Sequence, residues 1–261
     1  MLFGSALLSA ALVVSLLATR LATRRVARLV AVVLAVILVA QIVLLLSAPR
    51  GVTVALRSLA GIALLLGAFA VYDALAFART WLDRAREPLV LEPPFDGRWR
   101  VVAGGPLPGF NHHIVARDQY FAYDFVRVGA PSLNSAVLAP VAGTVVAASD
   151  GMDDRARSAK LDDPSIRGRE LGNYVVIAAP LGYVFLCHLA KGSVGVAPGD
   201  RVEAGDQLGR CGNSGRSSGA HLHVHAQDAP AYAFDAARGL PIAFRSGGEP
   251  KLLRPFSVLE R

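Results

Sequence analysis

The hydrophobic residues of this chain follow two different patterns, which change near residue 87. Before that point they form three long apolar runs, at 1–19, 29–48 and 58–77. A membrane-spanning helix needs about 20 apolar residues, so the second and third runs predict membrane helices. The first run has its arginines after the apolar stretch and shows no small-residue cleavage site, which argues against a signal peptide. We therefore expect about three transmembrane helices within residues 1–87.

Residues 88–261 have the pattern of an all-β domain. Short β-branched or aromatic segments with period two are bounded by Gly, Pro, Asn or Asp; they lie at 120–126, 135–149, 172–180, 182–190, 200–212 and 220–227. We expect antiparallel strands here, after a linker at 82–99 where prolines and charges replace the apolar runs. Residues 150–171 are densely charged without a period, so we expect a long exposed loop that forms a functional rim.

The charge balance agrees with this division. Residues 1–100 hold 11 arginines against 5 acidic residues, whereas residues 101–261 hold 16 basic against 15 acidic residues. The excess positive charge therefore flanks the apolar runs and does not form a nucleic-acid-binding face. We expect a membrane-embedded protein that does not bind nucleic acid.

Three of the six histidines occur at alternate positions in the segment HLHVH. On a strand, His221, His223 and His225 would face the same way at intervals of about 6.6 Å. Two neighbours could then share one metal ion, or one could bind the ion while the other meets a substrate. The run holds no glutamate, so it is not an HExxH zinc site. By itself this pattern also fits exposed strand histidines.

A second polar group lies upstream, in the segments NHHIVARDQYFAYDF and YVFLCHLA. Strand alternation places Phe121, Tyr123 and Phe125 on one face and Asp124 on the other, where Tyr120 and Ala122 also lie. A lone aspartate in so apolar a strand is costly to bury unless it is paired or binds a metal. Alternation likewise places His188 with Val184 and Leu186, and Cys187 on the opposite face.

Together, these segments resemble the lysostaphin/LytM-type zinc endopeptidases of bacterial cell walls. The resemblance runs from about Gly97 to Pro241 and includes APVAGTVVAAS, GNYVVI and VGVAPGDRVEAGDQLGRCGNSGRSSGAHLH. The chain departs from the family's usual spacing between the first histidine and the aspartate: here it is eleven residues (124 − 113) in place of four. The upstream Asn-x-His is similar to a branch of the family with a longer spacing.

The resemblance implies a lysostaphin-like β-sheet fold and a role for each of these polar residues. It makes His113, Asp124 and His223 the zinc ligands, and it makes His188 and His221 a catalytic pair that does not bind the ion. His112 would then point away, and His225, which has no counterpart, would be a strand histidine near the rim. In the family fold Cys187 and Cys211 would lie close enough for a disulfide; two buried thiols are the alternative.

The chemistry of the residues agrees with this assignment. Two imidazoles and a carboxylate suit Zn²⁺ with a fourth position open to water. Zinc lowers the pKa of such a water to about 7 and polarises a scissile carbonyl. Without a glutamate in the motif, His188 or His221 must activate the water or stabilise the oxyanion. We expect a zinc metalloendopeptidase acting on peptide cross-links of peptidoglycan.

Two other functions fit parts of the sequence. A catalytically silent scaffold of the same fold could regulate other cell-wall hydrolases, but such proteins are expected to lack ligands. The hairpin VAPGDRVEAGDQLG also resembles carrier and phosphocarrier domains. A lipoyl or biotinyl carrier needs a lysine at a hairpin tip, and none of Lys160, Lys191 and Lys251 lies there; a phosphocarrier has no need of Asp124.

The arginines conflict with the expected location. The loop at 20–28 carries four arginines, and the positive-inside rule therefore places that loop and the C-terminal domain in the cytoplasm. Peptidoglycan lies outside the cytoplasmic membrane. We give the metal-site pattern more weight and expect a multi-pass protein of the bacterial inner membrane whose catalytic domain is extracytoplasmic.

Overall fold

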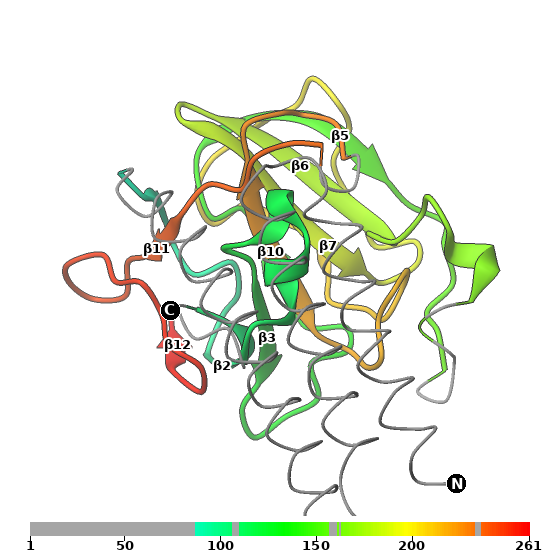
Figure 1. Cartoon of the computed structure of the whole chain (residues 1–261), viewed down its shortest axis with the longest axis horizontal. Coiled ribbons are helices and arrows are strands. Elements are labelled where there is room, and N and C mark those ends of the chain that lie inside the picture. Colours follow the sequence, from blue (N-terminus) through cyan, green and yellow to red (C-terminus); the bar gives the residue numbers. More distant parts are fainter. Residues whose placement is uncertain (1–86, 106–109, 157–160, 162, 233–235) are drawn as a thin grey trace, which may run out of the picture. The chain divides into compact units, whose positions relative to one another are not determined.

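The computed structural model describes residues 87–105, 110–156, 161, 163–232 and 236–261, which Figure 1 draws in colour. The chain divides into two compact units, Met1–Leu75 and Ala76–Arg261, and every described residue belongs to the second. The three predicted membrane helices lie outside the described residues. Within the described part, no helix is long and apolar enough to cross a membrane.

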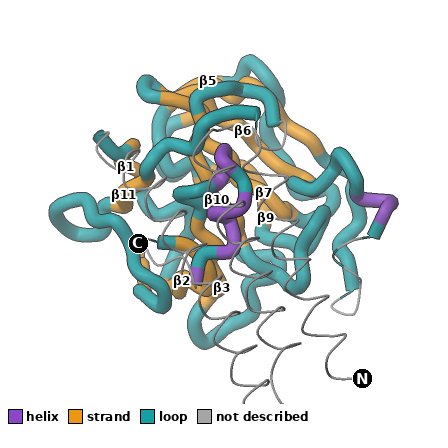
Figure 2. The backbone as a smooth tube through the Cα atoms, viewed as in Figure 1, coloured by secondary structure: helices purple, strands orange, loops and turns teal. Residues whose placement is uncertain are grey.

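The second unit is built from short strands and irregular loops, as Figure 2 shows. The strands are β1 (Leu89–Leu91), β2 (Arg98–Gly104), β3 (Tyr123–Arg127), β4 (Ala136–Leu138), β5 (Gly143–Ser149), β6 (Asn173–Ala179), β7 (Gly182–Leu189), β8 (Arg201–Val202), β9 (Gln207–Arg210), β10 (Leu222–Gln227), β11 (Ile242–Phe244) and β12 (Val258–Glu260). The described 3-10 helices include η2 (His112–Val115), η3 (Arg117–Gln119) and η4 (Pro164–Ile166). The expected all-β domain is confirmed.

Eight strands form one antiparallel sheet in the order β12-β2-β3-β10-β7-β6-β5-β8. Strands β4 and β9 form a small antiparallel pair, and β1 and β11 form a parallel one. Strand β10, which carries His223 and His225 and follows directly after His221, lies between β3 and β7 in the interior of the sheet (Figure 1). All six predicted strand segments contain observed strands.

The central strands bury both of their faces. On one face, Phe125 of β3, Leu186 of β7 and Leu222 of β10 join the main hydrophobic core, in which Phe95 and Trp99 stack with ring centroids 4.7 Å apart. Each large apolar side chain buried there contributes roughly 1.5–3 kcal/mol. The other face carries the polar residues of the same strands, and every residue of β10 is buried. We call this second side of the sheet the site face.

Two predictions about the domain's first strands were wrong. The linker expected at 82–99 extends too far, because β1 lies inside it and Leu91, Phe95 and Trp99 are fully buried. Strand β3 begins only at Tyr123, so residues 120–122 form a turn and do not follow strand alternation. Asp124 and Phe125 still lie on opposite faces of the sheet, as predicted.

A β-bulge at His188 changes which face that residue uses. Cys187 pairs with Tyr174 and Leu189 pairs with Asn173, so His188 is an extra residue on β7. Its backbone has φ 64°, a left-handed conformation that is uncommon for a residue other than glycine. The bulge places both Cys187 and His188 beside His223. The prediction that they lie on opposite faces was therefore wrong, because bulges reset strand alternation.

The turn between β9 and β10 packs closely against the backbone before β6. Gly172 has φ 67°, and a Cβ atom there would lie 2.5 Å from the Ser214 side chain and carbonyl carbon. Ser214 Oγ accepts a hydrogen bond from the Asn173 amide and donates one to the Leu189 carbonyl. A side chain at residue 172 would therefore displace this turn.

Replacing Gly172 by alanine should destabilise the domain more than the same change at Gly151. Both glycines have positive φ, which costs an L-residue about 1–2 kcal/mol, but a Cβ at Gly151 meets nothing within 4 Å. Gly172→Ala should cost about 1–3 kcal/mol more because of overpacking. Urea unfolding of residues 76–261 would measure this difference, and equal losses in the two variants would contradict the packing argument.

Candidate metal centre

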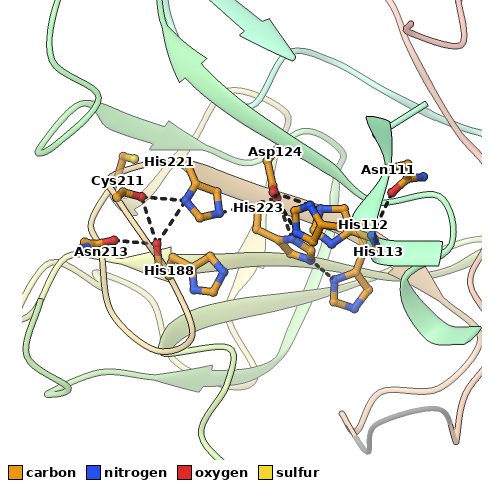
Figure 3. Close-up of polar contacts among 12 residues, drawn as sticks. Asn111, His112, His113, Asp124, His188, Cys211, Asn213, His221 and His223 are labelled. Atoms are coloured by element: carbon orange, nitrogen blue, oxygen red, sulfur yellow. Dashed lines mark hydrogen bonds and ion pairs between the residues drawn. The ribbon is translucent and has the colours of Figure 1, made fainter. Parts of the chain in front are cut away.

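The five residues predicted to form a site come together on the site face of the sheet. Asp124 on β3 is the cross-strand partner of His223 on β10. His113 comes from η2, His188 from the β7 bulge, and His221 from the residue before β10. Figure 3 shows His188 and His221 to one side of Asp124, with His112 and His113 to the other.

The Asp124 carboxylate is the centre of the group. Its Oδ2 lies 3.0 Å from His113 Nε2, and its Oδ1 lies 2.9 Å from His223 Nδ1 and 3.6 Å from His221 Nε2. Asp124, His113 and His223 are all buried. A carboxylate in such a place must be compensated by nearby donors or by a cation.

Asn111 holds η2 so that His113 faces this carboxylate. Its side-chain oxygen accepts a hydrogen bond from the His113 amide, and its Nδ2 donates to the carbonyls of Gly105 and Tyr120. Asn111 is itself only 1% exposed. The Asn-x-His pattern seen in the sequence therefore has a structural role, because it anchors an otherwise short and irregular segment.

The two histidines of the predicted catalytic pair are fixed through the same ring nitrogen. His188 Nδ1 lies 2.8 Å from the Ser214 carbonyl oxygen, and His221 Nδ1 lies 2.8 Å from that of Gly219. A carbonyl only accepts, so both rings carry their proton on Nδ1 when neutral. Their Nε2 atoms then hold lone pairs, and the two ring centroids are 4.8 Å apart.

The charged loop at 150–171 fastens the turn that supplies these carbonyls. Its Asp154 carboxylate accepts from the Asn213 amide, its Arg155 side chain donates to the Gly215 carbonyl, and its Glu170 carbonyl accepts from the amide of Arg216. Its described residues lack strands, as predicted, although Ile166 and Leu171 are buried. The loop thus acts on the site indirectly, by positioning residues 213–216.

Burial lowers the pKa of three histidines of the site. Burial lowers the pKa of His113 and, more strongly, of His188, and it lowers the pKa of His223 to about 4 although Asp124 opposes the shift. For Asp124, burial would raise the pKa, but His113, His221 and His223 together hold it well below 3.8. At neutral pH the centre therefore combines a carboxylate with imidazole lone pairs.

These residues fit a divalent metal ion. His113 Nε2 is buried and makes no well-formed hydrogen bond, although it lies 3.0 Å from Asp124 Oδ2. Ligand atoms around a tetrahedral zinc are about 3.3 Å apart, given bonds of about 2.0–2.1 Å. Two nitrogens at 2.9 and 3.0 Å from one carboxylate approach that spacing. An ion would satisfy the nitrogen that the protein leaves without a partner.

Within the described residues, two groups of potential ligands have all their ligand atoms within 4.8 Å of one another. One is His112, His113 and Asp124, and the other is Cys187, His223 and His225. The ligand set implied by the resemblance takes members from both groups, which meet where Asp124 contacts His223. The assignment of His113, Asp124 and His223 as the metal ligands stays a prediction.

Three predictions about neighbouring residues were wrong. His112 does not point away: its side chain is 71% exposed, yet Nε2 lies 3.7 Å from Asp124 Oδ2. His225 is not near a rim but fully buried, with Nδ1 2.9 Å from His223 Nε2. Cys187 and Cys211 are free thiols in different hydrophobic clusters. Cys187 faces the histidines as the cross-strand partner of His223, so the disulfide hypothesis is wrong and the alternative of two buried thiols is confirmed.

A match to a protein-family model identifies the family of one segment of the chain. Residues 126–233 match the model of peptidase family M23. This segment belongs to peptidase family M23. It contains His188, His221 and His223, whereas His113 and Asp124 precede it. The resemblance to lysostaphin and LytM-type peptidases is thus confirmed. No curated protein matches the chain.

Solved M23 structures are similar at low identity. The lysostaphin catalytic domain of Staphylococcus simulans is 20% identical, with a TM-score of 0.34, over 54% of this chain and 86% of that one. The catalytic domain of the Enterococcus faecalis M23 protein EnpA is 19% identical, with a TM-score of 0.38, over 60% and 95%. A Pseudomonas aeruginosa protein assigned to peptidase M23 is 21% identical, with a TM-score of 0.35, over 66% and 58%. The chain thus spans just over half of that last protein's length.

Proposed function

We propose that this protein is a membrane-anchored zinc metalloendopeptidase that hydrolyses peptide cross-links of bacterial peptidoglycan. The observation that carries the proposal is the convergence of His113 and His223 on the buried carboxylate of Asp124, with the paired rings of His188 and His221 beside it. Membership of a peptidase family supports the reaction, and the resemblance to cell-wall endopeptidases supports the substrate.

In this proposal His113, Asp124 and His223 hold the zinc ion. When bound, zinc supplies a hydroxide near neutral pH and polarises the scissile carbonyl. The protein supplies the remaining chemistry through His188 and His221, whose Nε2 lone pairs are free to accept a proton. The ring that takes the proton becomes a donor for the developing oxyanion or the leaving amine. Burial of His188 favours the neutral ring before the reaction.

A silent scaffold and a carrier module have less support. All five side chains expected in an active site are present and lie close together, whereas a scaffold has no need of them. A phosphocarrier could use a histidine pair, but it would not need a buried aspartate between histidines. Zinc binding therefore separates the peptidase from both alternatives.

We also propose that the apolar segments anchor the peptidase in the cytoplasmic membrane, with the catalytic domain outside. Three spans from a cytoplasmic N-terminus would carry the domain to the side where peptidoglycan lies. Tethering would keep hydrolysis local to the membrane-facing wall. The arginine distribution opposes this orientation, which makes the topology a direct test of the substrate.

Residues 76–261 should bind one zinc ion per chain, and Asp124→Ala should lose most of it. The variant removes the carboxylate that contacts both His113 and His223. His112→Ala is the matched control, because His112 is exposed and lies farther from Asp124. Metal analysis after dialysis would measure the stoichiometry. Full zinc in Asp124→Ala, or its loss in His112→Ala, would require a different ligand set.

His188→Ala and His221→Ala should retain zinc and lose hydrolysis of purified peptidoglycan by about 10²–10⁴-fold, as expected when a general acid or base is removed. Released fragments identified by mass would measure the rate and reveal the cleaved bond. Loss of zinc from either variant would show that the residue is a ligand. Unchanged hydrolysis would remove that residue from the catalytic pair.

A reporter fused after Arg261 should be active only if that reporter works outside the cytoplasm. The expectation follows from the substrate, since a peptidoglycan peptidase must face the wall. A cytoplasm-dependent reporter at the same position is the control and should stay inactive. Activity of the cytoplasmic reporter alone would contradict the cell-wall function, whatever the zinc content of the domain.

A further inference from the structure

The site face of β10 carries a row of three buried polar side chains. His223, His225 and Gln227 occupy alternate positions and therefore point the same way. Their exposed fractions are 3%, 0% and 0%. Only the first has a role in the proposed site. Buried polar groups in a sheet are costly unless they bind one another, so the other two require an explanation.

His223 makes a different contact through each ring nitrogen. Its Nδ1 lies 2.9 Å from Asp124 Oδ1, and its Nε2 lies 2.9 Å from His225 Nδ1. A neutral imidazole carries one proton, on one nitrogen or the other. If Nδ1 is to offer a lone pair to a metal, the proton must be on Nε2. There it can only donate to His225 Nδ1, which must then be an acceptor.

His225 is held in place on its other sides. Its ring stacks on Phe185 with centroids 4.5 Å apart and an interplanar angle of 14°. Gln227 Nε2 donates to the carbonyls of Ala229 and Ala231, which fixes the amide. Both Gln227 Oε1 and His225 Nε2 are buried without another well-formed hydrogen bond. An Nε2 proton on His225 directed at that amide oxygen would leave Nδ1 as the acceptor.

We propose that His225 is a positioning residue for the metal site: by accepting the Nε2 proton of His223, it presents the Nδ1 lone pair of His223 to the metal. Gln227 supports the required tautomer of His225. The inference rests on the proposed ligand role of His223. Partners of this kind typically change metal affinity by about 10–100-fold.

The same residues offer one competing explanation. Cys187, His223 and His225 have ligand atoms within 4.8 Å of one another and could themselves hold an ion. The two explanations differ in stoichiometry: positioning requires one ion per chain and the second site requires two.

Two variants of nearly equal shape separate the hydrogen bond from packing. His225→Asn places a carbonyl oxygen where Nδ1 stands, whereas His225→Leu places a methyl group there, and both remove the stacked ring. In the purified full chain, zinc affinity measured by chelator competition should fall about 10–100-fold in His225→Leu. His225→Asn should bind zinc about tenfold more tightly than His225→Leu, with similar thermal stability. In the zinc-loaded wild type, nitrogen NMR should show His223 protonated on Nε2.

Each outcome has a defined meaning. Equal zinc affinity in the Asn and Leu variants, or an unprotonated Nε2 on His223, would overturn the positioning role while leaving the metal site in place. Two ions per chain, with one lost in both His225 variants and in Cys187→Ser, would show that His225 is a ligand. A wild-type chain that binds no zinc would refute the proposed function, and the inference with it.

Discussion

A buried carboxylate is the constraint on which this domain is organised. Asp124 sits on an interior strand, 4% exposed, where an uncompensated charge would cost several kcal/mol. Three histidines from two parts of the chain approach it within 3.6 Å, namely His113, His221 and His223. Their contacts hold the pKa of Asp124 well below its usual range. The same contacts that offset the charge therefore create the candidate metal centre.

The sheet supports this centre because one of its faces forms the hydrophobic core and the other carries the polar residues. Aromatic and aliphatic residues on one face form the main core, while the site face of the same strands carries histidines and Asp124. A polar face can be buried only when its groups are satisfied. The turn at 213–219 meets this need by supplying carbonyls to the rings of His188 and His221, and the loop at 150–171 holds that turn in place. The same segments therefore both cover the site and orient its side chains.

The proposed chemistry and location make separate demands on the chain. The proposed chemistry requires only that the β domain fold and bring the proposed ligands together. A peptidoglycan substrate additionally requires that this unit be outside the cytoplasm, a property of the apolar N-terminal runs. The conflict between the arginine count and the substrate lies entirely in those runs. The proposed membrane topology could therefore be wrong even if the proposed metal centre is correct.

Period-two patterns in the sequence were enough to predict the all-β domain and the six strand segments, whereas the five converging residues were implied by the family resemblance. The resemblance also pointed to Asn111, two residues before His113. The environment of individual residues needed the tertiary structure. Strand alternation assumes an unbroken ladder, and the bulge at His188 has no signature in the sequence because it depends on pairing with β6.

Burial of His225 and the approach of His112 to Asp124 likewise depend on contacts between segments far apart in the chain. The sequence pattern shows which residues share a face of a strand, but only packing decides what covers each face. The contact between His223 and His225 follows the strand's own period, yet its importance appears only when both residues are buried. What the sequence determined was the set of groups and their local geometry; the tertiary structure decided which of them lose water, and burial is what turns ordinary histidines into a site.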